Sequence, residues 1–223
     1  MPQTTHEFSV RLQQDVSLRY LLHVPSVPPT GTGHPLIVFL HGAGERGDDL
    51  SLVLTQGLPR LLNEGLELPA IVISPQLPDG QLWTRHLPAV RALVDHVASE
   101  HDVDRDRITA TGLSLGGAGS YELVSSYPDV FAAVAPICGP WTVLYVTEES
   151  ARVPTWVFHG DADQGVRVED SHRLVEAIRR RGGEPRLTIF PGVGHNSWDP
   201  AYQDTDVLEW LLQQRLSDRS LAS

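Results

Sequence analysis

The sequence predicts an α/β fold in which about eight strands form a mostly parallel sheet flanked by helices. After residue 35, short continuous apolar runs alternate with longer stretches of helical periodicity, which is typical of buried parallel strands joined by crossover helices. Hydrophobic residues make up 41% and charged residues 20% of the chain, a composition typical of globular proteins. With 223 residues, we expect one domain with a core of its own.

The N-terminal part, residues 7–24, predicts a hairpin. Phe8, Val10 and Leu12 alternate with polar residues, and a second alternating run covers residues 18–24. We therefore expect two half-exposed antiparallel strands at one edge of the sheet. Residues 25–34 hold three prolines and two glycines and predict a loop.

The rest of the chain follows the parallel pattern. The expected strands cover residues 36–40, 70–74, 107–112, 131–137, 155–159 and 186–190. The expected helices cover residues 50–63, 87–100, 115–127, 168–181 and 204–216, and a tail at 217–223 should fray. Only residues 138–154 separate the strand expected at 131–137 from the strand expected at 155–159. We expect no large cap domain there and hence an open site.

Charge and composition disfavour several classes of partner. The net charge of −11 argues against nucleic acid and anionic membranes. No apolar stretch reaches the ~18 residues of a transmembrane helix, and the N-terminus lacks the apolar core of a secretion signal, so we expect a cytoplasmic protein. The single cysteine, Cys138, leaves no intrachain disulfide. We expect no metal or organic cofactor, and the sequence leaves the oligomeric state open.

A glycine-rich turn at residues 112–117, GLSLGG, follows a predicted strand and opens a predicted helix. In that context G-x-S-x-G predicts a nucleophile elbow, a strained turn that exposes the hydroxyl of Ser114 at the carboxyl edge of the sheet. Without this context, the motif G-x-S-x-G would also be compatible with the glycine-rich turns of nucleotide-binding folds. A nucleophilic serine further requires an acid and a histidine, which in this fold follow in the order Ser, Asp, His.

Candidates for both partners follow later strands. Asp163 comes after the strand at 155–159, and His195 comes after the strand at 186–190. Catalytic groups gather at the carboxyl ends of parallel strands, so these side chains should meet near Ser114. Asp161 is an alternative acid, and spacing alone does not separate it from Asp163.

Backbone amides are the expected donors to a negatively charged intermediate. One is the amide of Leu115, directly after Ser114. The other is that of Ala43, in the loop HGAGERG at residues 41–47 after the strand at 36–40. This loop lacks the Gly-Lys-Ser/Thr ending of a phosphate-binding loop.

Three tryptophans lie in predicted loops and are candidates for an apolar wall of a substrate pocket. They are Trp198, Trp83 and Trp141. For Trp83 and Trp141, an equally good interpretation is that they cover the sheet edges.

Four segments together resemble a known family: HGAGERG at 41–47, GLSLGG at 112–117, HGDAD at 159–163 and GVGHNSWD at 192–199. From about residue 36 to 210 the chain is similar to the predicted-peptidase and esterase branch of the α/β-hydrolases, akin to depolymerases and feruloyl-esterase-like enzymes. The resemblance implies the α/β-hydrolase fold, with Asp163 as the acid at the end of HGxxD.

The resemblance also implies an activity, namely cleavage of a small or extended carboxylic ester through an acyl-enzyme, with Ser114, His195 and Asp163 as a triad. Peptide or thioester hydrolysis would use the same residues. A non-catalytic binding module of the same fold is a further alternative, disfavoured because all three residues are present.

Overall fold

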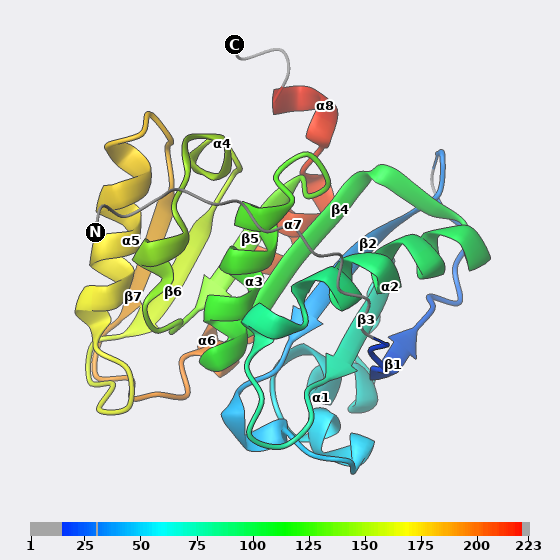
Figure 1. Cartoon of the computed structure of the whole chain (residues 1–223), viewed down its shortest axis with the longest axis horizontal. Coiled ribbons are helices and arrows are strands. Elements are labelled where there is room, and N and C mark those ends of the chain that lie inside the picture. The colour runs from blue at the N-terminus through cyan, green and yellow to red at the C-terminus, as the bar shows by residue number, and fades with distance from the viewer. Residues whose placement is uncertain (1–14, 30, 220–223) are drawn as a thin grey trace, which may run out of the picture.

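The computed structural model describes residues 15–29 and 31–219, which form a sheet of seven strands in the order β1-β3-β2-β4-β5-β6-β7 (Figure 1). The strands are β1 Arg19–His23, β2 His34–Leu40, β3 Ile71–Gln76, β4 Val103–Leu113, β5 Ala133–Ile137, β6 Trp156–Gly160 and β7 Arg186–Phe190. Strand β1 is antiparallel to β3, and the other neighbouring pairs in the described chain are parallel. The mostly parallel sheet with an antiparallel edge is therefore confirmed. The other predicted hairpin strand, around Phe8–Leu12, lies outside the described residues.

Helices cover both faces of the sheet, which gives three layers. One face carries α2 Leu87–Glu100, α3 Leu115–Ser126, α4 Glu148–Ala151 and α5 Val168–Arg179. The other carries α1 Gly57–Asn63, α6 Trp198–Gln203 and α7 Val207–Gln213. In Figure 1, α2, α3 and α5 lie in front of the sheet, with α6 and α7 behind it. The short elements are α8 Leu216–Arg219 and the 3-10 helices η1 Ala43–Glu45, η2 Leu50–Thr55, η3 Trp83–Arg85 and η4 Thr142–Tyr145.

The central strands are apolar throughout because both of their faces are covered. In β2, Leu36, Val38 and Leu40 pack toward α2 and α3, whereas Ile37 and Phe39 belong to the cluster formed with α1, α6 and α7. All seven residues of β2 are buried. A strand in this position shows a continuous apolar run instead of alternation, which is why it could be placed from the sequence.

Two predicted helices are wrong in their extent. The helix expected at 50–63 is divided into η2 and α1 at Gly57, which has φ +59° and leaves no room for a side chain against the ring of Phe39. The helix expected at 204–216 is α7 followed, after a break, by α8.

The expected fraying from residue 217 is also wrong for residues 217–219, which form part of α8. The amide and hydroxyl of Ser217 donate to the carboxylate of Asp106 at 2.7 and 2.8 Å. A long-range contact of this kind holds the turn in place. The predicted tail at 220–223 lies outside the described residues.

The segment 138–154, between β5 and β6, is described in full and holds only η4 and α4, two short helices that were not expected from the sequence. No cap domain is inserted there, so the carboxyl edge of the sheet next to β5 is left open. Among the described helices, none is both long enough and apolar enough to cross a bilayer.

Candidate active site

The turn between β4 and α3 presents Ser114 at the carboxyl edge of the sheet. Its backbone has φ 52° and ψ −120°, a conformation that residues other than glycine rarely adopt. The amide of Ser114 donates to the carbonyl of Ile137 at 2.9 Å, and its carbonyl accepts from the amide of Ala118 at 3.1 Å. The strained residue is thus held by β5 on one side and by α3 on the other.

The glycines around Ser114 are required by close backbone approach. A Cβ on Gly116 would lie 1.9 Å from the carbonyl oxygen of Leu40 in β2, and one on Gly112 would lie 2.4 Å from the carbonyl oxygen of Gly116. A Cβ on Gly117 would lie 2.3 Å from the carbonyl oxygen of Ile137. Each of these contacts is far inside van der Waals distance, so the turn exists only with glycine at these positions.

We expect Gly116→Ala to lower the free energy of unfolding by about 3 kcal/mol or more, because neither β2 nor α3 can move away without losing its own packing. Urea denaturation measures this change. The matched control is Gly44→Ala, whose added Cβ meets nothing within 4 Å and should change the stability by less than about 0.5 kcal/mol. Equal unfolding midpoints for the two variants would contradict the conclusion that close backbone approach requires glycine at position 116.

Three of the predicted site residues meet at the sheet edge. His195 Nε2 lies 2.9 Å from Ser114 Oγ, and His195 Nδ1 lies 2.7 Å from Asp163 Oδ2. An ionised carboxylate only accepts, so Nδ1 carries the proton and Nε2 has a lone pair directed at the serine hydroxyl. The Asp163 side chain is 0% exposed and that of His195 is 34% exposed. The acid is thus shielded from water, whereas the histidine faces the solvent side.

The carboxylate of Asp163 is held by its own loop. Its Oδ1 accepts from the amides of Gly165 and Val166 at 2.8 and 2.9 Å. Burial acts to raise the pKa of Asp163, but the hydrogen bonds from His195 and from these two amides outweigh it and keep the pKa below its ordinary value. The group is therefore ionised at neutral pH.

Asp161, the alternative acid, lies elsewhere. Its carboxylate accepts from the amide of Gly192 at 2.6 Å and so links the loops that follow β6 and β7. The structure brings Asp163, and not Asp161, to His195.

The two amides predicted as donors lie at helix N-termini beside Ser114. Ala43 is the first residue of η1, and Leu115 is the first residue of α3. An amide at the first position of a helix has no acceptor within that helix. A Cβ built on Gly42 would lie 3.5 Å from Ser114 Cβ, so the loop that carries Ala43 abuts the elbow.

Buried polar side chains anchor this loop. The amide of Leu77 donates to His41 Nε2 at 3.0 Å, so Nδ1 carries the proton and donates to the carbonyl of Gly42 at 2.6 Å. Burial and the nearby charge of Arg46 lower the pKa of His41 to about 4, despite the opposing hydrogen bond to Gly42. The carboxylate of Glu45 accepts from the amide of Gly42 at 2.8 Å. The role of Glu45 was missed from the sequence, where its only signal was an acid inside a glycine-rich loop.

Trp83 is not available to a substrate. It is 1% exposed, lies beneath α3 where a Cβ on Gly119 would approach its indole to 2.6 Å, and donates from Nε1 to the carbonyl of His41 at 3.1 Å. Its prediction as a pocket residue is therefore corrected: it is a core residue that supports the loop at 41–47.

The other two candidate tryptophans differ in exposure. Trp198 is 8% exposed and meets the His195 ring edge to face, with centroids 5.5 Å apart. Its Nε1 donates to the side chain of Gln56 at 3.1 Å, so it supports the histidine. Trp141 is 63% exposed with φ 55°, and Leu144 in η4 is 76% exposed. These two apolar side chains lie on the open segment after β5.

Ligand atoms of Cys138, Asp163 and His195 lie within 4.8 Å of one another, a spacing that a metal ion could bridge. The chemistry does not fit. Burial raises the pKa of the Cys138 thiol to about 12, whereas metals bind the thiolate. Asp163 and His195 already engage each other.

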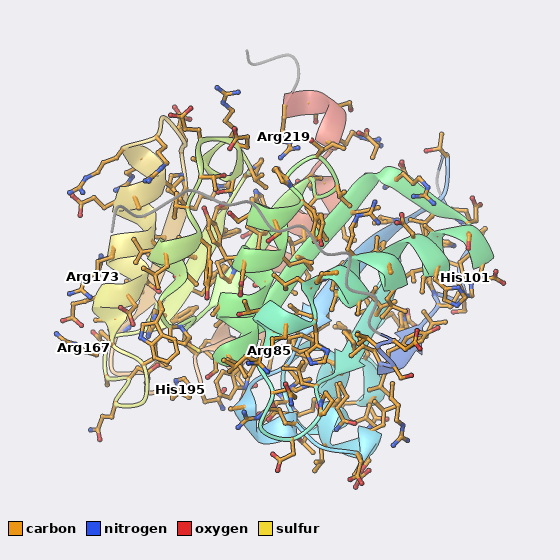
Figure 2. All side chains as sticks on the ribbon, in the orientation of Figure 1. Arg85, His101, Arg167, Arg173, His195 and Arg219 are labelled. Carbon is orange, nitrogen blue, oxygen red and sulfur yellow. The ribbon has the colours of Figure 1, made fainter. Side chains whose placement is uncertain are left out.

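A cavity of about 920 Å³ lies away from these residues, lined by the chain that leads into β6 and β7 together with residues of α7 and α8. Parallel strands begin there, whereas Ser114, Asp163 and His195 follow strand ends. In Figure 2, His195 lies at the lower left, whereas Arg219, a residue that lines the cavity, lies near the top. The candidate active site is therefore an exposed site at the carboxyl edge and is separate from the cavity.

Solved structures share this architecture. A thermostable esterase is 34% identical with a TM-score of 0.77, and the match covers 90% of this chain and 60% of that one. A ferulic acid esterase at 17% identity has a TM-score of 0.67 over 87% of this chain and 91% of its own. The predicted α/β-hydrolase fold is therefore confirmed.

Sequence comparisons point to the same group. Poly(3-hydroxyalkanoate) depolymerase C of Paucimonas lemoignei is 30% identical over 138 residues, which are 55% of this chain and 31% of the depolymerase. The chain thus spans about a third of the length of that relative. The family model for the dienelactone hydrolase family matches residues 76–205, which include Ser114, Asp163 and His195. The chain belongs to the dienelactone hydrolase family, within the α/β-hydrolases.

Proposed function

We propose that the protein is a serine esterase that cleaves carboxylic esters through an acyl-enzyme on Ser114. The observation that carries this proposal is the continuous relay from Ser114 Oγ to His195 Nε2 at 2.9 Å and from His195 Nδ1 to Asp163 Oδ2 at 2.7 Å. The family membership supports it, as does the similarity to proteins named as esterases and as a depolymerase.

In the first half of the reaction, Ser114 Oγ attacks the ester carbonyl carbon while His195 Nε2 takes the hydroxyl proton. The amides of Ala43 and Leu115 bind the oxygen that becomes negative. The imidazolium formed on His195 faces the ionised carboxylate of Asp163. As the tetrahedral intermediate collapses, the carbon–oxygen bond to the alcohol breaks and the proton passes from Nε2 to the departing oxygen.

The second half repeats these steps with water. His195 Nε2 removes a proton from the water as its oxygen attacks the acyl carbon, and the bond to Ser114 Oγ breaks as Oγ recovers the proton. The partial exposure of the histidine lets water reach this position, while burial of Asp163 keeps its charge unscreened.

The open edge favours an ester with a bulky or extended apolar part. Trp141 and Leu144 offer exposed apolar surface on the segment after β5, where a cap domain would otherwise cover the site. The names of the similar proteins, a poly(3-hydroxyalkanoate) depolymerase and a ferulic acid esterase, agree with substrates of this kind. A net charge of −11 further favours uncharged or cationic esters over polyanions.

A fluorophosphonate probe tests the nucleophile directly, because it phosphonylates a serine only where the hydroxyl is activated. We expect stoichiometric labelling, mapped by mass spectrometry of peptides to Ser114, and its loss after heat denaturation. A folded sample with no label on Ser114 would refute the proposal. Label on another serine would assign the activity to a different site.

A further inference from the structure

A second histidine lies against the catalytic acid. His159, in β6, has a fully buried side chain whose Nε2 is 3.2 Å from Asp163 Oδ2 and 3.0 Å from the carbonyl oxygen of Val166. Its Nδ1 lies 2.7 Å from Ser171 Oγ in α5. Both ring nitrogens therefore have polar partners in the protein interior.

These partners determine the tautomer of His159. The carbonyl oxygen of Val166 and the ionised carboxylate of Asp163 can only accept, so Nε2 must carry the proton. Nδ1 then has the lone pair and accepts from the hydroxyl of Ser171. In the other tautomer, the lone pair of Nε2 would face two oxygens, which is repulsive. The ring thus donates from Nε2 to the carbonyl of Val166, with the carboxylate of Asp163 beside it.

The ring of His159 also fixes the loop at 161–167, which carries Asp163. The carbonyl of Val166 accepts from His159, while its amide donates to Asp163 Oδ1 at 2.9 Å. Asp163 Oδ2 accepts from the N–H of His195 at 2.7 Å, and His159 Nε2 lies 3.2 Å from the same oxygen. The loop at 161–167 is therefore held at its base by a side chain of β6.

We propose that His159 is a positioning residue for Asp163. Its Nε2–H binds the carbonyl of Val166 and so holds the loop at 161–167. The carboxylate of Asp163, bound by two amides of that loop, then stays aligned with His195 Nδ1 when that ring becomes cationic. Ser171, whose hydroxyl donates to Nδ1, anchors the other side of the ring. The inference rests on the proposed esterase function, because the alignment matters only if His195 acts as a base.

The pair His159→Gln and His159→Asn tests this role. A glutamine amide reaches the position of Nε2 and can donate to the carbonyl of Val166, whereas an asparagine amide reaches only the position of Nδ1 and can contact only Ser171. We expect the Gln variant to keep kcat within about threefold of the wild type and the Asn variant to lose about tenfold or more, with KM unchanged. In proton NMR, the low-field signal of the Asp163–His195 hydrogen bond should be present in the wild type and in His159→Gln and should be lost in His159→Asn.

Val157→Ala is the control for a purely structural effect, because Val157 is buried on the same strand and packs into the same core without a polar contact. We expect this variant to be less stable with unchanged kcat. A kcat of the Asn variant within twofold of the wild type would overturn the inference. The inference would also be overturned if kcat fell in proportion to the unfolding temperature across His159→Gln, His159→Asn and Val157→Ala, because the loss would then be structural.

If His159→Asn does not fold, Ser171→Ala decides the question, since it removes only the hydroxyl that donates to Nδ1 and anchors the ring of His159 against α5. A kcat about threefold lower at unchanged KM supports the role, and an unchanged kcat overturns it. Failure of the proposed function is distinct from either result, because then the wild-type protein itself would hydrolyse no ester.

Discussion

Ser114→Ala should lower kcat for a short-chain p-nitrophenyl ester by a factor on the order of 10⁶ while leaving the fold intact. Alanine removes Oγ, the atom that lies 2.9 Å from His195 Nε2, and no acyl-enzyme can form without it. Alanine and serine both carry a Cβ, so the strained turn at φ 52° should tolerate the change. Any residual rate would come from the amides of the loop at 41–47 and of Leu115.

Initial rates with purified protein measure this loss, and circular dichroism with thermal unfolding checks the fold. Ser120→Ala is the matched control, because Ser120 is a buried serine of α3, the helix that follows Ser114, and its hydroxyl donates to the carbonyl of Gly117. It should keep kcat within about twofold. Turnover by Ser114→Ala close to the wild-type rate would identify another nucleophile.

Asp163→Asn should lower kcat by a factor of about 10⁴ with little change in KM. The amides of Gly165 and Val166 need an acceptor, so the oxygen of the new side chain must face them and its NH₂ group must face His195. Nδ1 of His195 would then have to accept, which places the proton on Nε2. In that tautomer the histidine cannot take a proton from Ser114.

Steady-state kinetics of Asp163→Asn beside Asp161→Asn measure this effect. Because the carboxylate of Asp161 bonds to the amide of Gly192, its replacement should leave kcat within about threefold of the wild type. A larger loss in Asp161→Asn than in Asp163→Asn would show that the wrong carboxylate has been assigned.

The parts of the fold that the sequence predicted well are those in which local pattern and tertiary environment agree. Strand β2 is buried on both faces, so its apolar run is continuous and could be placed to within two residues of its bounds. Helix α2, with one face on the core, has the bounds that its periodicity predicts. The break at Gly57 could not be foreseen, because it depends on the ring of Phe39, which approaches from β2.

The same distinction applies to the candidate site. Ser114, Asp163 and His195 follow three parallel strands, β4, β6 and β7, and this order predicted that they would meet, because parallel strands end at one edge. Sequence spacing could not separate Asp161 from Asp163, since the choice depends on how the loop after β6 closes. Nor could it show that Trp83 lies beneath α3, because a predicted loop does not reveal which side of the chain packs inward.

The short segment 138–154 between β5 and β6 is a place where the sequence could change during evolution without moving the nucleophile. The nucleophile is positioned by main-chain atoms of β2, β4 and β5 and by helix α3; these elements lie outside that segment, although Gly139 at its start packs against α3. The apolar surface of Trp141 and Leu144 lies wholly within it. Insertions or substitutions in the segment 138–154 can therefore change the preference for an acyl or alcohol group, while the sheet keeps Ser114 in the same position.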